Sequence, residues 1–142
     1  MKRPLKIILP IFLVLASGIV LLFALFTRPV RLGFTEKITL NHVYAGKDIH
    51  VEITDKDDFA RLISICRGRA VNDGAVPSCG CGPTPELIFE GKGKRVALYP
   101  GGDTCGTMRL GEEDKYFYGL SEKNFAVFRE ILAKYGVTFP CL

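Results

Sequence analysis

The chain has no acidic residue before Glu36 and no charged residue of either sign between Ile7 and Thr27. This uncharged segment of 21 residues matches the roughly 20 residues that a helix needs to cross a hydrocarbon core of about 30 Å. A buried helix of a soluble protein would instead need polar positions along one face. The sequence therefore predicts a membrane-spanning helix over residues 7–27, which contacts the lipid bilayer. A short tail over residues 1–6 precedes it, and a domain over residues 28–142 follows.

Two features of removable or lipid-modified leaders are also missing. A cleaved signal peptide has an apolar stretch of about 7–15 residues and then a small-residue cleavage site. Here the small residues of "LASG" at positions 15–18 are followed by eight further apolar residues. A lipoprotein signal places its acylated cysteine directly after such a stretch, and position 19 is Ile. We therefore expect the apolar segment to remain as an anchor.

Basic residues flank both ends of the anchor, so the positive-inside rule gives only a small preference for one orientation. Three precede it and three follow it within ten positions: Lys2, Arg3, Lys6, Arg28, Arg31 and Lys37. The free amino terminus before the anchor and Glu36 after it favour the orientation with the amino end inside. We expect the amino end in the cytoplasm and the domain outside.

The rest of the chain lacks the basic excess of a nucleic-acid-binding domain. The net charge is +4, but the three basic residues of the tail account for most of it. Without them, 16 basic residues face 15 acidic ones. Nucleic acid is therefore not expected as a partner.

Beyond the anchor, alternation of apolar and polar residues predicts strands near residues 36–44 and 48–54. Apolar residues at helical spacing predict a helix near 56–67. Four further strands follow, "ELIFE", "KRVALYP", "TCGTMRL" and "KYFYGL", separated by glycine-rich turns. A last helix is capped by Ser121 and ended by Gly136. The order ββα then ββββα predicts an α+β fold with two helices packed on one face of a small antiparallel sheet.

The apolar residues of these strands and helices are expected to form the core. Its members are Phe59, Leu62, Leu87, Phe89, Val96, Leu98, Phe125, Phe128 and Leu132.

Five cysteines would be expected to form disulfide bonds outside the cytoplasm, and the odd number leaves one unpaired. The candidates are Cys66, Cys79, Cys81, Cys105 and Cys141. Residues 69–85, which include the Cys-Gly-Cys pair, are expected to be irregular. A bridge from Cys66 into that stretch would close a loop of about 14 residues, worth roughly 3 kcal/mol in the chain-entropy model. Cys141 could bond Cys105 or the second cysteine of the Cys-Gly-Cys pair, Cys81, and sequence alone does not fix the connectivity.

A second hypothesis gives the cysteines a chemical role. Cys79, Cys81 and Cys105 could hold a soft metal such as Cu(I) or zinc, or exchange thiols. Structural zinc sites usually combine two ligand pairs, whereas one Cys-Gly-Cys stands alone here. Structural cross-linking is therefore the preferred interpretation, and no metal or cofactor is expected.

No catalytic set of residues emerges from the rest of the sequence. His42 lies in phase with the apolar residues of its strand, which is typical of a packed, hydrogen-bonded histidine. His50 lies between Asp48 and Glu52 on the expected solvent face. The segment "GGDTCGTMRLG" lacks the Gly-Lys-Ser/Thr of a phosphate loop.

The layout of anchor, strand pair, helix, cysteine-bearing strands and final "YFYGLS" helix is similar to that of small extracytoplasmic domains of bacterial membrane proteins. We therefore expect a single-pass membrane protein with a non-enzymatic binding or accessory domain and a protein partner in the cell envelope. The alternative is a thiol-redox or soft-metal protein that uses the Cys-Gly-Cys loop.

Overall fold

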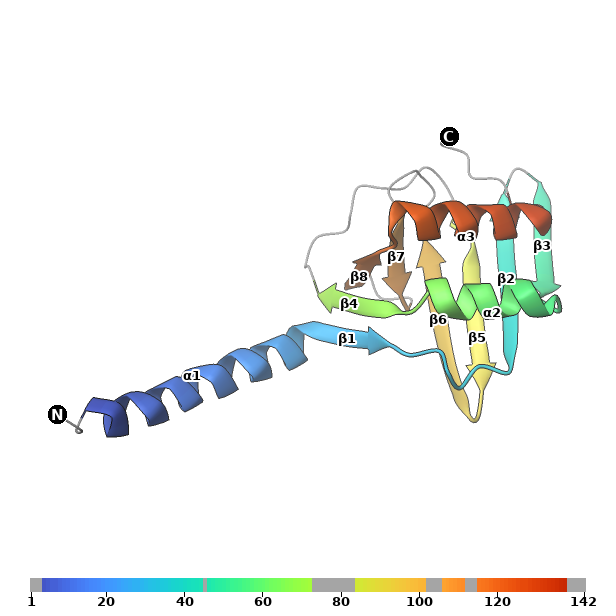
Figure 1. Ribbon diagram of the computed structural model, residues 1–142. Helices are drawn as coiled ribbons and strands as arrows, with labels where there is room; N and C mark the ends of the chain where they lie inside the picture. The colour runs from blue at the N-terminus through green and yellow to red at the C-terminus, as the bar shows by residue number, and fades with distance from the viewer. Residues whose placement is uncertain (1–3, 45, 73–83, 102–105, 112–114, 138–142) are drawn as a thin grey trace.

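A computed structural model describes residues 4–44, 46–72, 84–101, 106–111 and 115–137 (Figure 1). These residues form an amino-terminal helix, an eight-stranded sheet and two further helices. The elements are α1 (Pro4–Phe26), β1 (Thr27–Val30), β2 (Lys37–Tyr44), β3 (Lys47–Glu52), α2 (Lys56–Ile65), β4 (Gly68–Asn72), β5 (Glu86–Gly91), β6 (Lys94–Pro100), β7 (Thr107–Leu110), β8 (Tyr116–Gly119) and α3 (Glu122–Lys134).

The sheet is antiparallel throughout, with the strand order β1-β4-β8-β7-β6-β5-β2-β3. Helices α2 and α3 lie over one of its faces (Figure 1). The predicted α+β fold, with an antiparallel sheet and two helices on one face, is confirmed.

Two strands were not predicted. β1 follows the anchor directly and pairs with β4 from Thr27 opposite Val71 to Val30 opposite Gly68. The expectation that residues 69–85 are irregular is therefore wrong for residues 69–72. β4 has five residues, of which Ala70 alone is fully buried, so it lacks the repeated alternation by which a strand is recognised. Residues 73–83 lie outside the described part of the chain.

Several predicted boundaries shift by one or two residues. The anchor helix ends at Phe26, and Thr27 is already the first residue of β1. Helix α2 ends at Ile65, with Cys66 as its C-cap, instead of continuing to residue 67. The end of α3 is as predicted, because Gly136 has a φ of 85°, which glycine adopts without strain.

The predicted core lies between the sheet and the helices. Seven of the nine expected residues are buried, and the other two, Phe59 and Val96, are partly buried against them. Asp58 of α2 is also buried, at 2% exposed, and accepts a hydrogen bond from Lys134 Nζ of α3 at 3.0 Å. The Tyr135 hydroxyl lies 3.3 Å from the same carboxylate. These bonds join the two helices at the edge of the core.

Helix α1 and the sheet are joined without a linker. The Thr27 hydroxyl donates to the Phe23 carbonyl at 2.8 Å, and Arg69 Nη1 donates to the Thr27 hydroxyl at 3.0 Å. The Arg69 guanidinium also lies 5.0 Å from the centroid of the Phe23 ring. A residue of β4 therefore packs on the last turn of α1.

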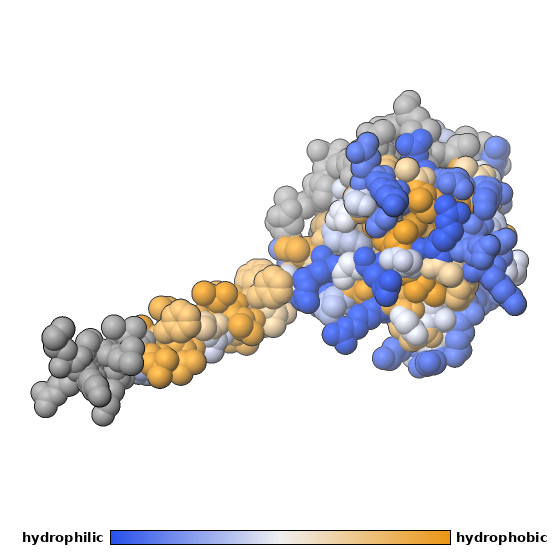
Figure 2. Space-filling model, in the orientation of Figure 1, coloured by the Kyte–Doolittle hydropathy of each residue, from blue (hydrophilic) through white to orange (hydrophobic). Residues whose placement is uncertain are grey.

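Helix α1 has the length and composition needed to cross a membrane. Its segment Leu9–Phe26 has a mean hydropathy of 2.7, and none of it is buried against the rest of the protein. Figure 2 shows this apolar surface projecting from a domain whose visible face mixes hydrophilic residues, mainly at its periphery, with hydrophobic ones. It is one candidate span among the described residues.

Candidate functional site

The face of the sheet opposite the helices carries a row of polar and aromatic side chains. Along each strand, alternate residues point to opposite faces, so the neighbours of the core residues point away from the helices. The strand register places five such residues side by side across β3, β2, β5, β6 and β7: His50, Asn41, Glu86, Tyr99 and Arg109. We call these five residues the polar row.

Hydrogen bonds connect four members of the polar row. Asn41 Nδ2 donates to Glu86 Oε2 at 2.8 Å, and the Tyr99 hydroxyl donates to Glu86 Oε1 at 2.7 Å. Because the amide nitrogen of Asn41 faces the carboxylate, its Oδ1 faces His50 Nδ1, at 2.6 Å. An amide oxygen only accepts, so the proton of this bond belongs to His50 Nδ1.

The Arg109 side chain lies at the other end of the polar row, next to Tyr99. The Arg109 guanidinium lies 4.5 Å from the centroid of the Tyr99 ring, within the range of a cation–π contact. Arg95 Nη2 lies 3.7 Å from Glu86 Oε1.

Glu86 is held in its charged form by these neighbours. Burial alone would raise the pKa of its carboxyl, but the hydrogen bonds from Asn41 and Tyr99 and the nearby charge of Arg95 lower it on balance. Both carboxylate oxygens therefore already have donors. A carboxylate with a lowered pKa is a weak general base near neutral pH, so the row is better suited to recognition than to proton transfer.

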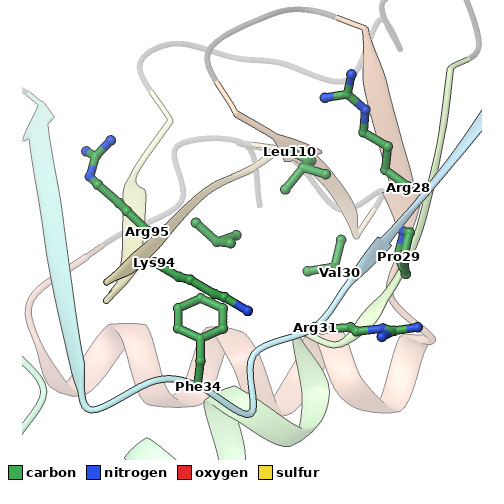
Figure 3. A pocket seen from close by; sticks show the side chains of 9 residues that line it. Arg28, Pro29, Val30, Arg31, Phe34, Lys94, Arg95 and Leu110 are labelled. Atoms are coloured by element: carbon green, nitrogen blue, oxygen red, sulfur yellow. The ribbon is translucent and has the colours of Figure 1, made fainter. Parts of the chain in front are cut away.

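A pocket lies elsewhere in the domain, between β1 and the strands β6 and β7 (Figure 3). It has a volume of about 420 Å³. β1 is not a neighbour of β6 or β7 in the sheet, so the pocket joins parts that are distant in strand order. Its lining is of two kinds, apolar and basic: Val30, Phe34, Val96, Leu110 and Pro29, with Arg28, Arg31, Lys94 and Arg95. We call it the basic pocket.

The basic side chains of this pocket differ in their partners. Arg95 forms ion pairs with Glu86 and Glu90, each at 3.7 Å. The other three, Arg28, Arg31 and Lys94, are exposed and have no carboxylate within 4.0 Å among the described residues. No acidic side chain lines the pocket, so its charge is positive.

Of the five cysteines, only Cys66 falls within the described residues. It is fully buried and carries a free thiol, and burial raises the pKa of that thiol. The structure does not support a bridge from Cys66. Cys79, Cys81, Cys105 and Cys141 lie outside the described residues, so their pairing stays a prediction, as does the metal or thiol hypothesis. The described residues contain no group of three or more His, Cys, Asp or Glu that could hold a metal.

The two histidines lie on the faces predicted for them. His42 is 4% exposed and stacks on Tyr44, with ring centroids 5.9 Å apart. The expectation that it is hydrogen-bonded is wrong, because neither ring nitrogen has a partner among the described residues. His50 is exposed on the opposite face and belongs to the polar row.

Most of the polar row and all of the basic pocket were missed at the sequence level. Their residues come from separate strands and form no local motif. The only available signal was the polar phase of each alternating strand, which becomes informative once the order of the strands is known.

Comparisons of the chain with protein-family models, with curated proteins and with solved structures find no match.

Proposed function

We propose that this chain is a single-pass membrane protein with its amino end in the cytoplasm. Its domain lies outside, where it acts as a non-enzymatic binding or accessory module of the cell envelope. The anchor is supported by the apolar helix Leu9–Phe26, which is exposed along its whole length. The expected partner is another protein of the envelope, and the polar row is the surface that contacts it.

The polar row is the observation that carries this proposal. Tyrosine and arginine are frequent among the residues that dominate protein interfaces, and Tyr99 and Arg109 stack on each other in this row. The hydrogen bonds of Glu86 fix the neighbouring side chains before a partner arrives. Side chains that are already ordered lose less entropy on binding.

Photo-crosslinking in living cells tests the assignment of this surface. A photoreactive residue would replace Val43, which is 64% exposed and lies on the same face and strand as Asn41. A matched control would replace Ala126, which is exposed on α3. We expect a discrete protein adduct from position 43 and none from position 126.

The adduct should depend on the polar row itself. Combining His50→Ala with Tyr99→Phe removes two of its hydrogen-bonding groups while leaving the buried core unchanged. The adduct from position 43 should then disappear while the melting temperature stays close to that of the parent. An adduct of equal strength from both positions, or one that persists in the double variant, would show that the polar row is not the binding surface.

A further inference from the structure

We propose that the basic pocket binds the phosphate headgroup of an anionic lipid from the membrane that holds α1. This site lies apart from the polar row and adds a lipid ligand to the protein partner proposed above.

The pocket lies close to α1 along the chain. Two of its cations, Arg28 and Arg31, belong to or directly follow β1, which begins at the residue after α1. At about 3.3 Å per strand residue, Arg31 lies no more than roughly 17 Å along the chain from the end of the helix. Membrane helices tilt by about 20° on average, and such a tilt brings one side of a directly attached domain closer to the headgroups.

Contacts between β4 and the end of α1 hold the pocket in place. Arg69 binds both the Thr27 hydroxyl and the face of the Phe23 ring. The junction between helix and sheet is therefore braced from β4 as well as through the backbone. The pocket stays beside the surface in which α1 is inserted, where the local concentration of headgroups is high.

The lining of the pocket matches the chemistry of an anionic lipid headgroup. Arg28, Arg31 and Lys94 lack carboxylate partners among the described residues, and each is able to donate to a phosphate oxygen. Figure 3 shows Lys94 extending over Phe34 into the pocket, with Val30 and Leu110 across the cavity from Phe34 and with Arg28 and Arg31 on the β1 rim, their guanidinium groups turned outward. An apolar floor beneath basic groups suits a lipid, whose glycerol and first methylenes adjoin its phosphate. An inorganic anion would make no use of that floor.

Native mass spectrometry of the full chain tests the proposal. The protein would be purified in detergent and mixed with equal amounts of phosphatidylglycerol and phosphatidylcholine. We expect preferential retention of phosphatidylglycerol. In the double variant Arg31→Gln with Lys94→Gln this preference should fall on the order of 20-fold, because each basic group near an anionic surface contributes about fivefold.

A matched variant controls for the loss of two charges. Lys47 and Lys56 are exposed and lie outside the pocket, so Lys47→Gln with Lys56→Gln should keep the parent's preference. Both double variants should unfold at the parent temperature, because all four side chains are exposed.

Three results would overturn the proposal. The first is equal retention of the two lipids by the parent protein. The second is an equal loss of preference in both double variants, which would mean that only net charge matters. The third is full displacement of phosphatidylglycerol by millimolar glycerol phosphate, which would identify a site for soluble anions.

Discussion

The buried His42, which has no hydrogen-bond partner among the described residues, should make the free energy of unfolding depend on pH. Its side chain is buried near the end of β2, where the ring stacks on Tyr44. Burial lowers the pKa of its imidazole. In the unfolded chain the pKa is about 6.5. Between the folded and unfolded values the unfolded state binds more protons, so the free energy of unfolding falls as the pH falls below about 6.5.

Replacing His42 with leucine should remove that pH dependence. We expect the parent to lose stability relative to His42→Leu between pH 7 and pH 5, by at most about 1.4 kcal/mol per pH unit for one proton. Urea unfolding of the full chain in detergent at both pH values measures the difference. Parallel changes in the two proteins would mean that His42 takes up its proton without unfolding.

Cys66 leads to a prediction about the other four cysteines. Its thiol is buried and its pKa is raised, so it should not react with iodoacetamide in the folded protein. Under denaturing conditions without reductant, we expect one alkylated cysteine and two intact disulfides by mass spectrometry. Three or more alkylated cysteines would favour the thiol or metal hypothesis for Cys79, Cys81 and Cys105.

At the scale of elements, α3 is the larger of the two helices that cover the sheet. Phe128 is fully buried on it and stacks on Phe125, with ring centroids 6.5 Å apart. Phe128→Ala should lower the free energy of unfolding by about 3–5 kcal/mol through lost burial and the resulting cavity. The exposed Lys123 of the same helix is the control, since Lys123→Ala should change stability by less than about 0.5 kcal/mol.

The elements that sequence predicts well are those with a repeated pattern. On the face towards the helices, β2, β5 and β6 carry core residues at every second position, and both domain helices carry theirs at helical spacing. That spacing is visible in the chain. β1 and β4 are strands because they pair with each other. Pairing between residues about 40 positions apart produces no local sequence pattern that would predict either strand. The polar row could not be predicted for the same reason, because its contacts depend on the register of five strands and not on a local sequence pattern.

For the whole molecule, the orientation of the anchor decides which compartment contains the domain. We expect protease added to intact spheroplasts to remove the domain beyond the anchor, since we propose that residues 28–142 lie outside. An epitope tag at the carboxyl end would report its loss in immunoblots, with a cytoplasmic protein as the control for intact cells. Protection of the tag until lysis would place the domain inside and remove the oxidising environment on which the disulfide prediction depends.

The direct passage from Phe26 of α1 to Thr27 of β1 also limits how far the domain can move away from the end of the helix. A flexible stalk of 20 residues would add about 25 Å of reach, whereas a domain of this size has a radius of gyration of only about 13 Å. With α1 in a membrane, as we propose, a domain without a stalk would sample a thin layer over the bilayer, and its encounters would be confined to diffusion in two dimensions. Its partners would then be molecules that share that layer, which favours neighbours embedded in or attached to the same membrane over freely diffusing ones.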